Sequence, residues 1–240
     1  MSKYDDPDFF QKYSQMARSK HGLEAAGEWH ELQKMLPDFK DKSVLDLGCG
    51  YGWHCLYAAE HGATKVIGVD LSSKMIGVAK SKTSSDIITY NVQNIADIDF
   101  PANSFDVVIS SLTFHYLPDF DNIVTKVKKC LVEGGDFVFS VENPVFTAYG
   151  TGDWYYNEKG EPLHWPVDNY FSEGVRHSNF LGADVVKYHK TIATYINTLI
   201  KYDFKITKVV EPMPEEKLIE QMPDESRRPM MLLISAKLYK

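Results

Sequence analysis

The sequence is poor in cysteine, and its cysteines are not paired. Three occur in 240 residues, Cys49, Cys55 and Cys130, with no C-x-x-C spacing. An odd number of thiols argues against a disulfide framework, and the missing pair spacing argues against a structural zinc site. We therefore expect no bound metal.

Long apolar runs are also missing. No apolar stretch approaches the roughly 20 residues that cross a bilayer. The first six residues, MSKYDD, contain no apolar segment and no small-residue cleavage site of the kind that secretory signals carry. These absences predict a cytoplasmic protein without membrane contacts.

Positive charge is in deficit. The chain has 26 Lys and Arg against 33 Asp and Glu, a net charge of −7. An acidic protein gains little from counterion release on nucleic acid, and the basic clusters at 126–129 and 227–228 are short. We expect a neutral or cationic small-molecule partner and no nucleic acid. For the assembly we expect a monomer or a homodimer.

Short apolar runs alternate with helix-like segments between residues 43 and 142. Such alternation is typical of parallel βαβ units. The expected strands cover 43–47, 65–69, 87–90, 105–110 and 136–141, and the expected helices cover 52–61, 72–82 and 119–131. Strand-like runs at 205–211 and 230–238 follow. The pattern predicts an α/β, Rossmann-like fold: a seven-stranded, mostly parallel sheet with helices on both faces and an antiparallel last strand.

Two segments lie outside this alternation. Residues 1–36 predict a cap of two helices, one starting at Pro7 and one covering 23–35. Residues 143–184 are rich in aromatic side chains and predict an insertion after the fifth strand, followed by a helix over 183–201. We interpret 1–240 as a single domain in which cap and insertion meet over the ligand cleft and form the acceptor site.

The strongest local signal is a glycine-rich turn. Residues 44–52, VLDLGCGYG, place Gly48 and Gly50 between a buried strand and a helix, where the backbone can pass close to a ligand. Asp46 precedes the glycines; a carboxylate there would repel a pyrophosphate but suits a ligand with an amino group. Asp70 ends the next strand, a position that typically accepts hydrogen bonds from ribose hydroxyls. The alternative role for Asp70 is to cap the following helix.

These segments resemble the class I S-adenosylmethionine-dependent methyltransferases. VLDLGCGYG is similar to their first motif and VIGVDLSSKMI to their second. PANSFDVVISSLTFHYLPDF resembles the fourth-strand region of the small-molecule branch, the type 11 methyltransferase domain, and LVEGGDFVFSVENP resembles the fifth strand. The four motifs occur in order over residues 43–142. The resemblance implies transfer of a methyl group from S-adenosylmethionine to a small molecule, with S-adenosylhomocysteine as the product.

The resemblance also assigns cofactor contacts. Asp46, Gly48 and Gly50 would line the methionine part, Asp70 would hold the ribose, and Leu71 and Met75 would sandwich the adenine. Asn94 would read the adenine edge through its side chain and Ile95 through its backbone N–H. Many family members have Asp where this chain has Asn94, and Gln93 is the alternative residue for this adenine contact. The backbone carbonyl of Ser110 would accept a hydrogen bond from the amino group of the cofactor. The predicted cofactor-binding set is therefore Tyr13, Asp46, Gly48, Gly50, Asp70, Leu71, Met75, Asn94, Ile95 and Ser110.

His115, just past the fourth strand, is the catalytic candidate. A general base is required only if the acceptor must lose a proton. His54 and His164 are rivals for that role. The aromatic residues that could surround a flat or cationic acceptor are Tyr13, Tyr116, Trp154 and Trp165.

Other functions share parts of this pattern. A nicotinamide-dependent oxidoreductase would also need a glycine turn and a ribose acid, but its G-x-G-x-x-G spacing differs from the G-C-G-Y-G found here. A nucleic-acid methyltransferase of the amino-methylating type would carry an Asn/Asp-Pro-Pro-aromatic motif after the fourth strand, where this chain has SSLT. A non-catalytic S-adenosylmethionine-binding protein would have the same binding motifs.

Overall fold

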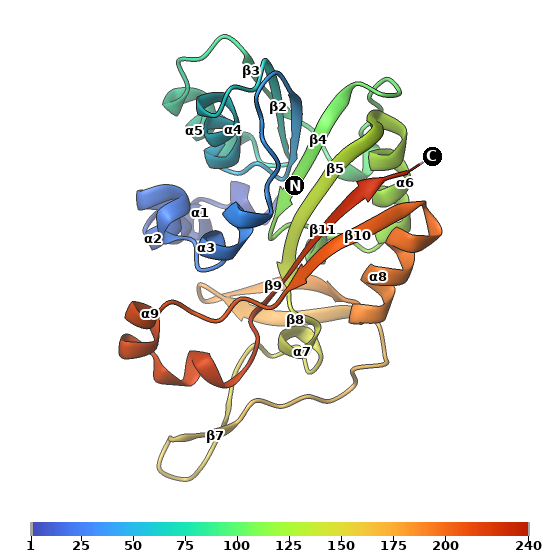
Figure 1. Ribbon diagram of the computed structural model, residues 1–240. Helices are drawn as coiled ribbons and strands as arrows, with labels where there is room; N and C mark the ends of the chain where they lie inside the picture. Colours follow the sequence, from blue (N-terminus) through green and yellow to red (C-terminus); the bar gives the residue numbers. More distant parts are fainter. Residues whose placement is uncertain (1, 240) are drawn as a thin grey trace.

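A computed structural model describes residues 2–239, and its centre is a seven-stranded sheet (Figure 1). The strand order is β10-β11-β5-β4-β1-β2-β3. All neighbouring pairs are parallel except those that include β11, which runs antiparallel to both β10 and β5. The fold class predicted from the sequence is confirmed. The strands are β1 (Ser43–Leu47), β2 (Lys65–Asp70), β3 (Ile88–Val92), β4 (Phe105–Ser111), β5 (Leu131–Glu142), β10 (Phe204–Val210) and β11 (Met231–Leu238).

Helices cover both faces of this sheet because successive side chains of a strand point to opposite faces and the buried strands are apolar on both. Leu45 and Leu47 pack in a core with residues of α6 and α8, whereas Val44 packs in a second core with residues of α4 and α5. The helices are α4 (Trp53–Glu60), α5 (Ser73–Lys82), α6 (Phe120–Cys130) and α8 (Ile192–Lys201). Among the described residues, no helix is long and apolar enough to cross a membrane.

Side-chain caps set where α5 and α6 begin. The Ser72 side chain accepts a hydrogen bond from the Met75 N–H, and the Asp119 side chain accepts one from the Asn122 N–H. These contacts satisfy amides that have no partner inside the helix. The predicted start of each helix is therefore confirmed within a residue.

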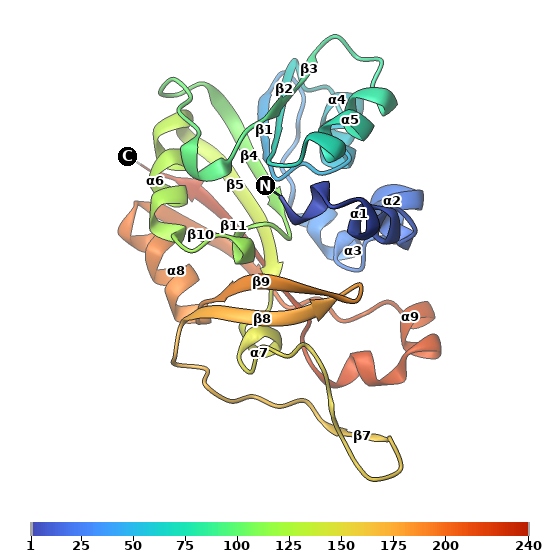
Figure 2. The ribbon, with the colours of Figure 1, turned by 180° about the vertical axis from the view of Figure 1, so that it is seen from behind.

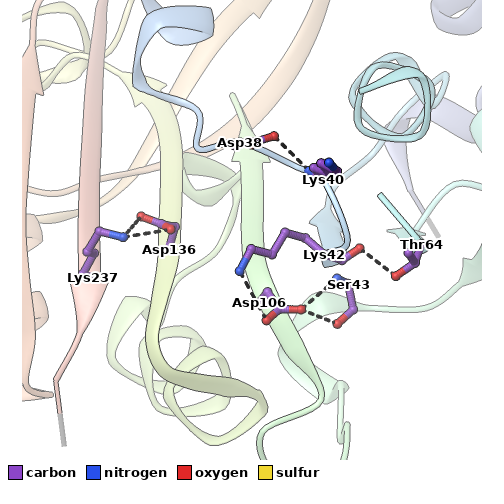
Figure 3. Close-up of polar contacts among 8 residues, drawn as sticks. All are labelled: Asp38, Lys40, Lys42, Ser43, Thr64, Asp106, Asp136 and Lys237. Carbon is purple, nitrogen blue, oxygen red and sulfur yellow. Dashed lines mark hydrogen bonds and ion pairs between the residues drawn. The ribbon is translucent and has the colours of Figure 1, made fainter. Parts of the chain in front are cut away.

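Polar contacts join the strands at the end of the sheet opposite the glycine turn (Figure 3). Asp106, at the start of β4, accepts hydrogen bonds from the backbone and hydroxyl of Ser43 at 2.9 and 2.8 Å. Lys42 lies 3.9 Å from the same carboxylate, and Lys237 of β11 pairs with Asp136 of β5 at 2.9 Å. These contacts hold neighbouring strands together while leaving the opposite strand ends free for a ligand.

The N-terminal cap is more broken than predicted. The first helix, α1 (Pro7–Ser14), begins at Pro7 as expected, but α2 (Ala17–His21) and α3 (Trp29–Leu32) replace one helix over 23–35. The predicted helix is interrupted at Ala26, whose backbone is extended, and the neighbouring Gly27 is unfavourable inside a helix. The remaining turns of the cap are the 3₁₀ segments η1 (Lys3–Asp5), η2 (Gly22–Ala25) and η3 (Gln33–Met35).

The prediction of a helix over 183–201 is wrong in its first part. Residues 183–189 form strand β9 (Ala183–His189), which pairs antiparallel with β8 (Gly174–Phe180). Leu181 and Gly182 both have positive φ, 55° and 77°, as a two-residue hairpin turn requires. The helix starts only at Ile192, where the Thr191 side chain caps it. Pairing with a neighbouring strand has overridden the helical pattern of the sequence.

The β8–β9 hairpin lies across the carboxyl ends of the central strands, beside the N-terminal helices (Figure 2). The part of the insertion that contains β7 (Pro162–His164) reaches away from the sheet. The connection between β10 and β11 contains short helices. The remaining elements are α7 (Pro144–Thr147), β6 (Tyr155–Tyr156), β7 (Pro162–His164), α9 (Glu216–Gln221) and the 3₁₀ turns η4 (Ile95–Asp97), η5 (Phe114–Tyr116) and η6 (Pro223–Arg227).

Candidate active site

A cavity of about 700 Å³ lies at the carboxyl ends of the parallel strands. Its walls come from the glycine turn, the ends of β2 and β4, the N-terminal segment and the β8–β9 hairpin. Ligands of open α/β sheets bind at this edge, where the strand order reverses between β1 and β4. The residues of the predicted cofactor set and the catalytic candidate that line the cavity are Tyr13, Gly48, Gly50, Asp70, Leu71, Met75, Asn94, Ile95 and His115; the further candidates His54 and Tyr116 line it as well.

The turn after β1 depends on glycine. Gly48, Gly50 and Gly52 all have positive φ, at 80°, 52° and 77°. A Cβ on Gly48 would lie 2.8 Å from the Cβ of Thr113, closer than packed atoms approach. A Cβ on Gly50 would meet no protein atom within 4 Å. Gly50 therefore leaves an open cradle at the cavity wall, which fits a ligand that lies against the backbone.

Asp70 connects the end of β2 to this turn. Its Oδ2 accepts a hydrogen bond from the Gly50 N–H at 2.9 Å, and its Oδ1 accepts one from the Ser72 N–H at 2.8 Å. Burial raises the pKa of the carboxyl, while these two hydrogen bonds oppose the shift. The side chain thus orders the loop and also lines the cavity.

The next residues along the wall form a largely apolar slot. Leu71 is 48% exposed at the cavity, whereas Met75 is buried beneath it on α5. The Asn94 side-chain oxygen accepts a hydrogen bond from the Ala96 N–H and so caps η4. Asn94 lines the cavity, and Gln93 is not among the lining residues. The apolar slot, with a carboxylate at one end, fits an adenosine group.

Two predicted cofactor residues do not reach the cavity. Asp46 is 1% exposed and lies behind the turn, where the Cys55 thiol donates to its Oδ2 at 3.4 Å. The Ser110 hydroxyl donates to the Leu47 carbonyl, and the residue is fully buried. Because β4 extends one residue further than predicted, Ser111 and Leu112 line the cavity in place of Ser110.

The candidate histidines differ in position. His54 and His115 line the cavity, whereas His164 lies exposed on β7, stacked on Tyr155. Burial lowers the pKa of both His54 and His115 to about 4, so both rings are neutral at pH 7. The Glu142 N–H donates to His115 Nδ1 at 3.3 Å. The proton of the neutral His115 ring therefore resides on Nε2, which makes that nitrogen a donor and not a base.

Sequence reasoning missed two ion pairs at the cavity, each with at least one buried partner. Arg18 of α2 pairs with Glu28 at 3.3 Å, and the Ser111 hydroxyl donates to the same glutamate oxygen at 2.8 Å. Lys187 of β9 pairs with Glu142, at the end of β5, at 2.6 Å. No local spacing indicates these pairs, because their partners are 10 and 45 residues apart on different elements.

The N-terminal cap meets the insertion over the cavity through the hairpin tip. Lys12 Nζ donates to the Leu181 carbonyl at 3.0 Å, and the Phe9 and Phe180 rings lie 5.9 Å apart. Trp154 and Trp165, expected near the acceptor, are not among the lining residues. They pack on the Arg228 guanidinium instead, with ring centroids at 5.4 and 4.3 Å. Cation–π packing to the C-terminal segment holds these aromatic side chains away from the cleft.

The buried histidines predict how stability depends on pH. Near pH 5.5 and just below, unfolding should take up nearly two protons, on His54 and His115, because their pKa values rise from about 4 to an ordinary 6.5. Burial raises the pKa of Asp46 from 3.8 to about 7, so this carboxyl should release one proton on unfolding. Net uptake of one proton should lower the free energy of unfolding by roughly 1.4 kcal/mol per pH unit as the pH falls.

Urea denaturation of the ligand-free protein at several pH values measures this slope. Asp46→Asn removes the opposing proton release, so its slope should steepen to roughly 2.7 kcal/mol per pH unit. An unchanged or shallower slope in Asp46→Asn would show that Asp46 is already ionised in the folded protein.

Comparison with known proteins supports one family. Residues 45–139 match a methyltransferase domain family. A proposed S-adenosylmethionine-dependent methyltransferase from Listeria monocytogenes is 57% identical, with a TM-score of 0.85, and the match covers 90% of this chain and 100% of that one. An S-adenosylmethionine-dependent methyltransferase from Mesorhizobium loti is 40% identical over the same shares, with a TM-score of 0.82.

A curated relative acts in ubiquinone biosynthesis. The ubiquinone biosynthesis O-methyltransferase of Coxiella burnetii is 35% identical, over 46% of this chain and 47% of that enzyme.

The family match and the two structural relatives, whose chains are covered completely, support a methyltransferase and not the nicotinamide-dependent alternative. The chain therefore belongs to the class I S-adenosylmethionine-dependent methyltransferases and is a methyl-transferring enzyme that uses S-adenosylmethionine.

Proposed function

We propose that this enzyme transfers the methyl group to a small molecule held inside the cavity. The observation that carries the proposal is the roof over the strand ends, where α1 and the hairpin tip meet through Lys12 and Leu181. A roof of this kind separates the reacting groups from water and leaves little room for a folded macromolecule. The net charge of −7 is also unfavourable for binding nucleic acid.

The cofactor is assigned to the half of the cavity that the motifs line. Asp70 would accept hydrogen bonds from the ribose, Leu71 and Met75 would contact the adenine, and Ile95 would present its N–H to the adenine edge. Gly48 and Gly50 would lie against the methionine part. When bound there, S-adenosylmethionine supplies a methyl group on a positively charged sulfur.

Cap residues extend this assignment. Arg18 and Tyr13 both line the cavity, and the Tyr13 ring lies 6.0 Å from the ring of Tyr51 in the glycine turn. An arginine matches a carboxylate in charge and in hydrogen-bond geometry, so we assign Arg18 to the carboxylate of the methionine part. The cap would then close the cavity and also contribute to cofactor binding.

The acceptor would occupy the remaining half, beside His115 and the hairpin. Relatives differ in acceptor: the ubiquinone biosynthesis enzyme is an O-methyltransferase, whereas a 34% identical protein of Saccharomyces cerevisiae, of which the match covers 51%, is a protein arginine N-methyltransferase. The roofed cavity favours a small acceptor over a protein. His115 Nε2–H would donate a hydrogen bond to the acceptor or to charge that develops on it.

Calorimetry on the purified protein tests the cofactor assignment. We expect saturable binding of S-adenosylmethionine and of S-adenosylhomocysteine, and no appreciable binding of NAD. S-adenosylhomocysteine should also raise the melting temperature, since a ligand that binds only the folded state stabilises it. Binding of NAD without a response to either sulfur compound would refute the proposal.

A further inference from the structure

A polar cluster lies in the acceptor half of the cavity, outside the cofactor motifs. It consists of Glu142 at the end of β5, Lys187 on β9, Ser178 on β8 and His115 on η5, and all four residues line the cavity. Ser178 and Lys187 lie on the same face of the hairpin, because Ser178 pairs with Val185 and alternate residues share a face. The hairpin thus brings its polar groups to the strand end that carries Glu142.

The cluster is only partly satisfied within the protein. Glu142 Oε1 accepts a hydrogen bond from Lys187 Nζ at 2.6 Å. The second oxygen of that carboxylate, Oε2, is buried and has no hydrogen-bond partner among the described residues, and the same holds for Ser178 Oγ. Buried polar atoms in folded proteins almost always have partners. Two orphaned oxygens in one cavity wall therefore indicate a ligand that supplies the missing partners.

The hydrogen-bonding capacity of the cluster defines what that ligand offers. Glu142 Oε2 can only accept, so the ligand must supply a donor. His115 Nε2–H and Lys187 Nζ can only donate, so the ligand must also supply an acceptor. A hydroxyl group has one donor and two acceptor positions and matches both requirements. An ammonium group offers no acceptor, and a carboxylate offers no donor and would be repelled by Glu142.

The surrounding wall is apolar. Phe146, Phe180, Val185 and Met231 line the cavity around the cluster. An aromatic or otherwise flat apolar body fits such a wall, because its burial is favourable and it leaves no polar group without a partner. The cluster would contact the hydroxyl while the wall contacts the body of the molecule.

Resting on the function proposed above, we propose that the acceptor is an apolar molecule with a weakly acidic hydroxyl, a phenol or an enol, and that the enzyme methylates this oxygen. Glu142 Oε2 accepts the hydroxyl proton as the oxygen attacks. The new O–CH₃ bond forms while the S–CH₃ bond breaks. The electron pair of the S–CH₃ bond remains on the sulfur, which becomes a neutral thioether. Lys187 and His115 Nε2–H stabilise the negative charge on the oxygen.

The charges in the cluster explain why the hydroxyl must be weakly acidic. Glu142 Oε1 already accepts a hydrogen bond from Lys187, so Oε2 is the oxygen left to take up the proton. A carboxylate removes a proton efficiently only from a hydroxyl that is itself weakly acidic. An aliphatic alcohol holds its proton too tightly for a carboxylate to remove it. A phenol or an enol beside a lysine is acidic enough.

The first experiment compares three probes with one ring system: 2-naphthol, 2-naphthylamine and 2-naphthoate. Each is incubated with the full-length protein and methyl-labelled S-adenosylmethionine, and its binding to the S-adenosylhomocysteine complex is measured by calorimetry. We expect 2-naphthol to bind and to be methylated at least tenfold faster than the other two. Faster methylation of the amine or the acid, or no binding of 2-naphthol to a complex that holds the cofactor, overturns the inference. Failure to bind either sulfur compound refutes the proposed function instead.

The second experiment tests Glu142 as the proton acceptor. Glu142→Gln keeps an oxygen that accepts from Lys187 but cannot take up a proton. With 2-naphthol we expect turnover to fall about 100-fold, while the dissociation constant for S-adenosylhomocysteine changes less than twofold. With 4-nitrophenol at a pH where it is ionised, the variant should keep turnover within threefold of the wild type, because no proton has to be removed.

A matched variant separates this effect from damage to the fold. Glu225→Gln alters a second buried ion pair, between Glu225 and Arg228 at 3.0 Å, and neither residue lines the cavity. It should leave turnover of both phenols unchanged. Equal loss of both activities in Glu142→Gln would show a merely structural role and overturn the assignment. The comparison of the three probes uses the wild type, so it decides the acceptor class even if Glu142→Gln does not fold.

Discussion

Asp70→Ala is expected to weaken S-adenosylmethionine binding by roughly 3–5 kcal/mol, because two hydrogen bonds from ribose hydroxyls to a charged oxygen would be lost. Asp70 is the one carboxylate in the assigned cofactor half that lies between the glycine turn and the apolar slot. Calorimetry with S-adenosylhomocysteine measures the loss directly. A change of this size would move a micromolar dissociation constant into the millimolar range.

The same substitution also affects the fold. The N–H groups of Gly50 and Ser72 lose their acceptor, which should cost about 1–3 kcal/mol of unfolding free energy. Asp5→Ala is the matched control, because the Asp5 carboxylate accepts from the Ser72 hydroxyl and the Lys74 N–H but does not line the cavity. It should lower stability modestly and leave cofactor affinity within threefold. Wild-type affinity in Asp70→Ala, together with a lower melting temperature, would show that Asp70 only orders the loop.

Gly48→Ala is expected to lower the free energy of unfolding by roughly 3 kcal/mol or more. An alanine there must hold a left-handed backbone, at about 1–2 kcal/mol, and its Cβ would lie 2.8 Å from the Cβ of Thr113. Relief of that contact requires the loop after β4 to move, and with it the Thr113 hydroxyl that donates to the Ser111 carbonyl. Urea denaturation measures the loss of stability.

Gly50→Ala should separate binding from folding. Its Cβ meets no protein atom within 4 Å, so only the cost of the left-handed backbone, about 1–2 kcal/mol, should appear in the unfolding free energy. The added methyl group would instead occupy the space against which the cofactor is assigned, and S-adenosylhomocysteine affinity should fall at least tenfold. Equal destabilisation in both variants would contradict the distinction, as would unchanged affinity in Gly50→Ala.

Local sequence signals determined most of the sheet. Parallel strands that are buried on both faces are continuously apolar, so β1 is predicted to the residue and the other strands to within two residues, except that β5 begins at Leu131, five residues before its predicted start. The turn at Gly48–Gly52 is equally local, because its conformation depends on residues that follow one another in the chain. Nine of the eleven residues in the predicted cofactor and catalytic sets line one cavity.

Contacts between distant segments decided the rest. Val185 and Val186 belong to a strand because a partner strand lies beside them, and a helical period alone does not reveal that partner. Asp46 and Ser110 are buried and do not line the cavity, because strand depth and the exact end of β4 depend on how the sheet packs.

The acceptor half of the site is formed entirely by contacts between segments that are distant in the sequence. Glu142 and Lys187 are 45 residues apart and meet only because the hairpin folds back over the end of β5. The tautomer of His115 depends on the backbone N–H of Glu142, which lies 27 residues further along the chain. Periodicity and motifs predict the local structure that each residue forms with its neighbours in the chain. The chemistry of this half depends instead on distances, burial and charge between segments that only the folded chain brings together.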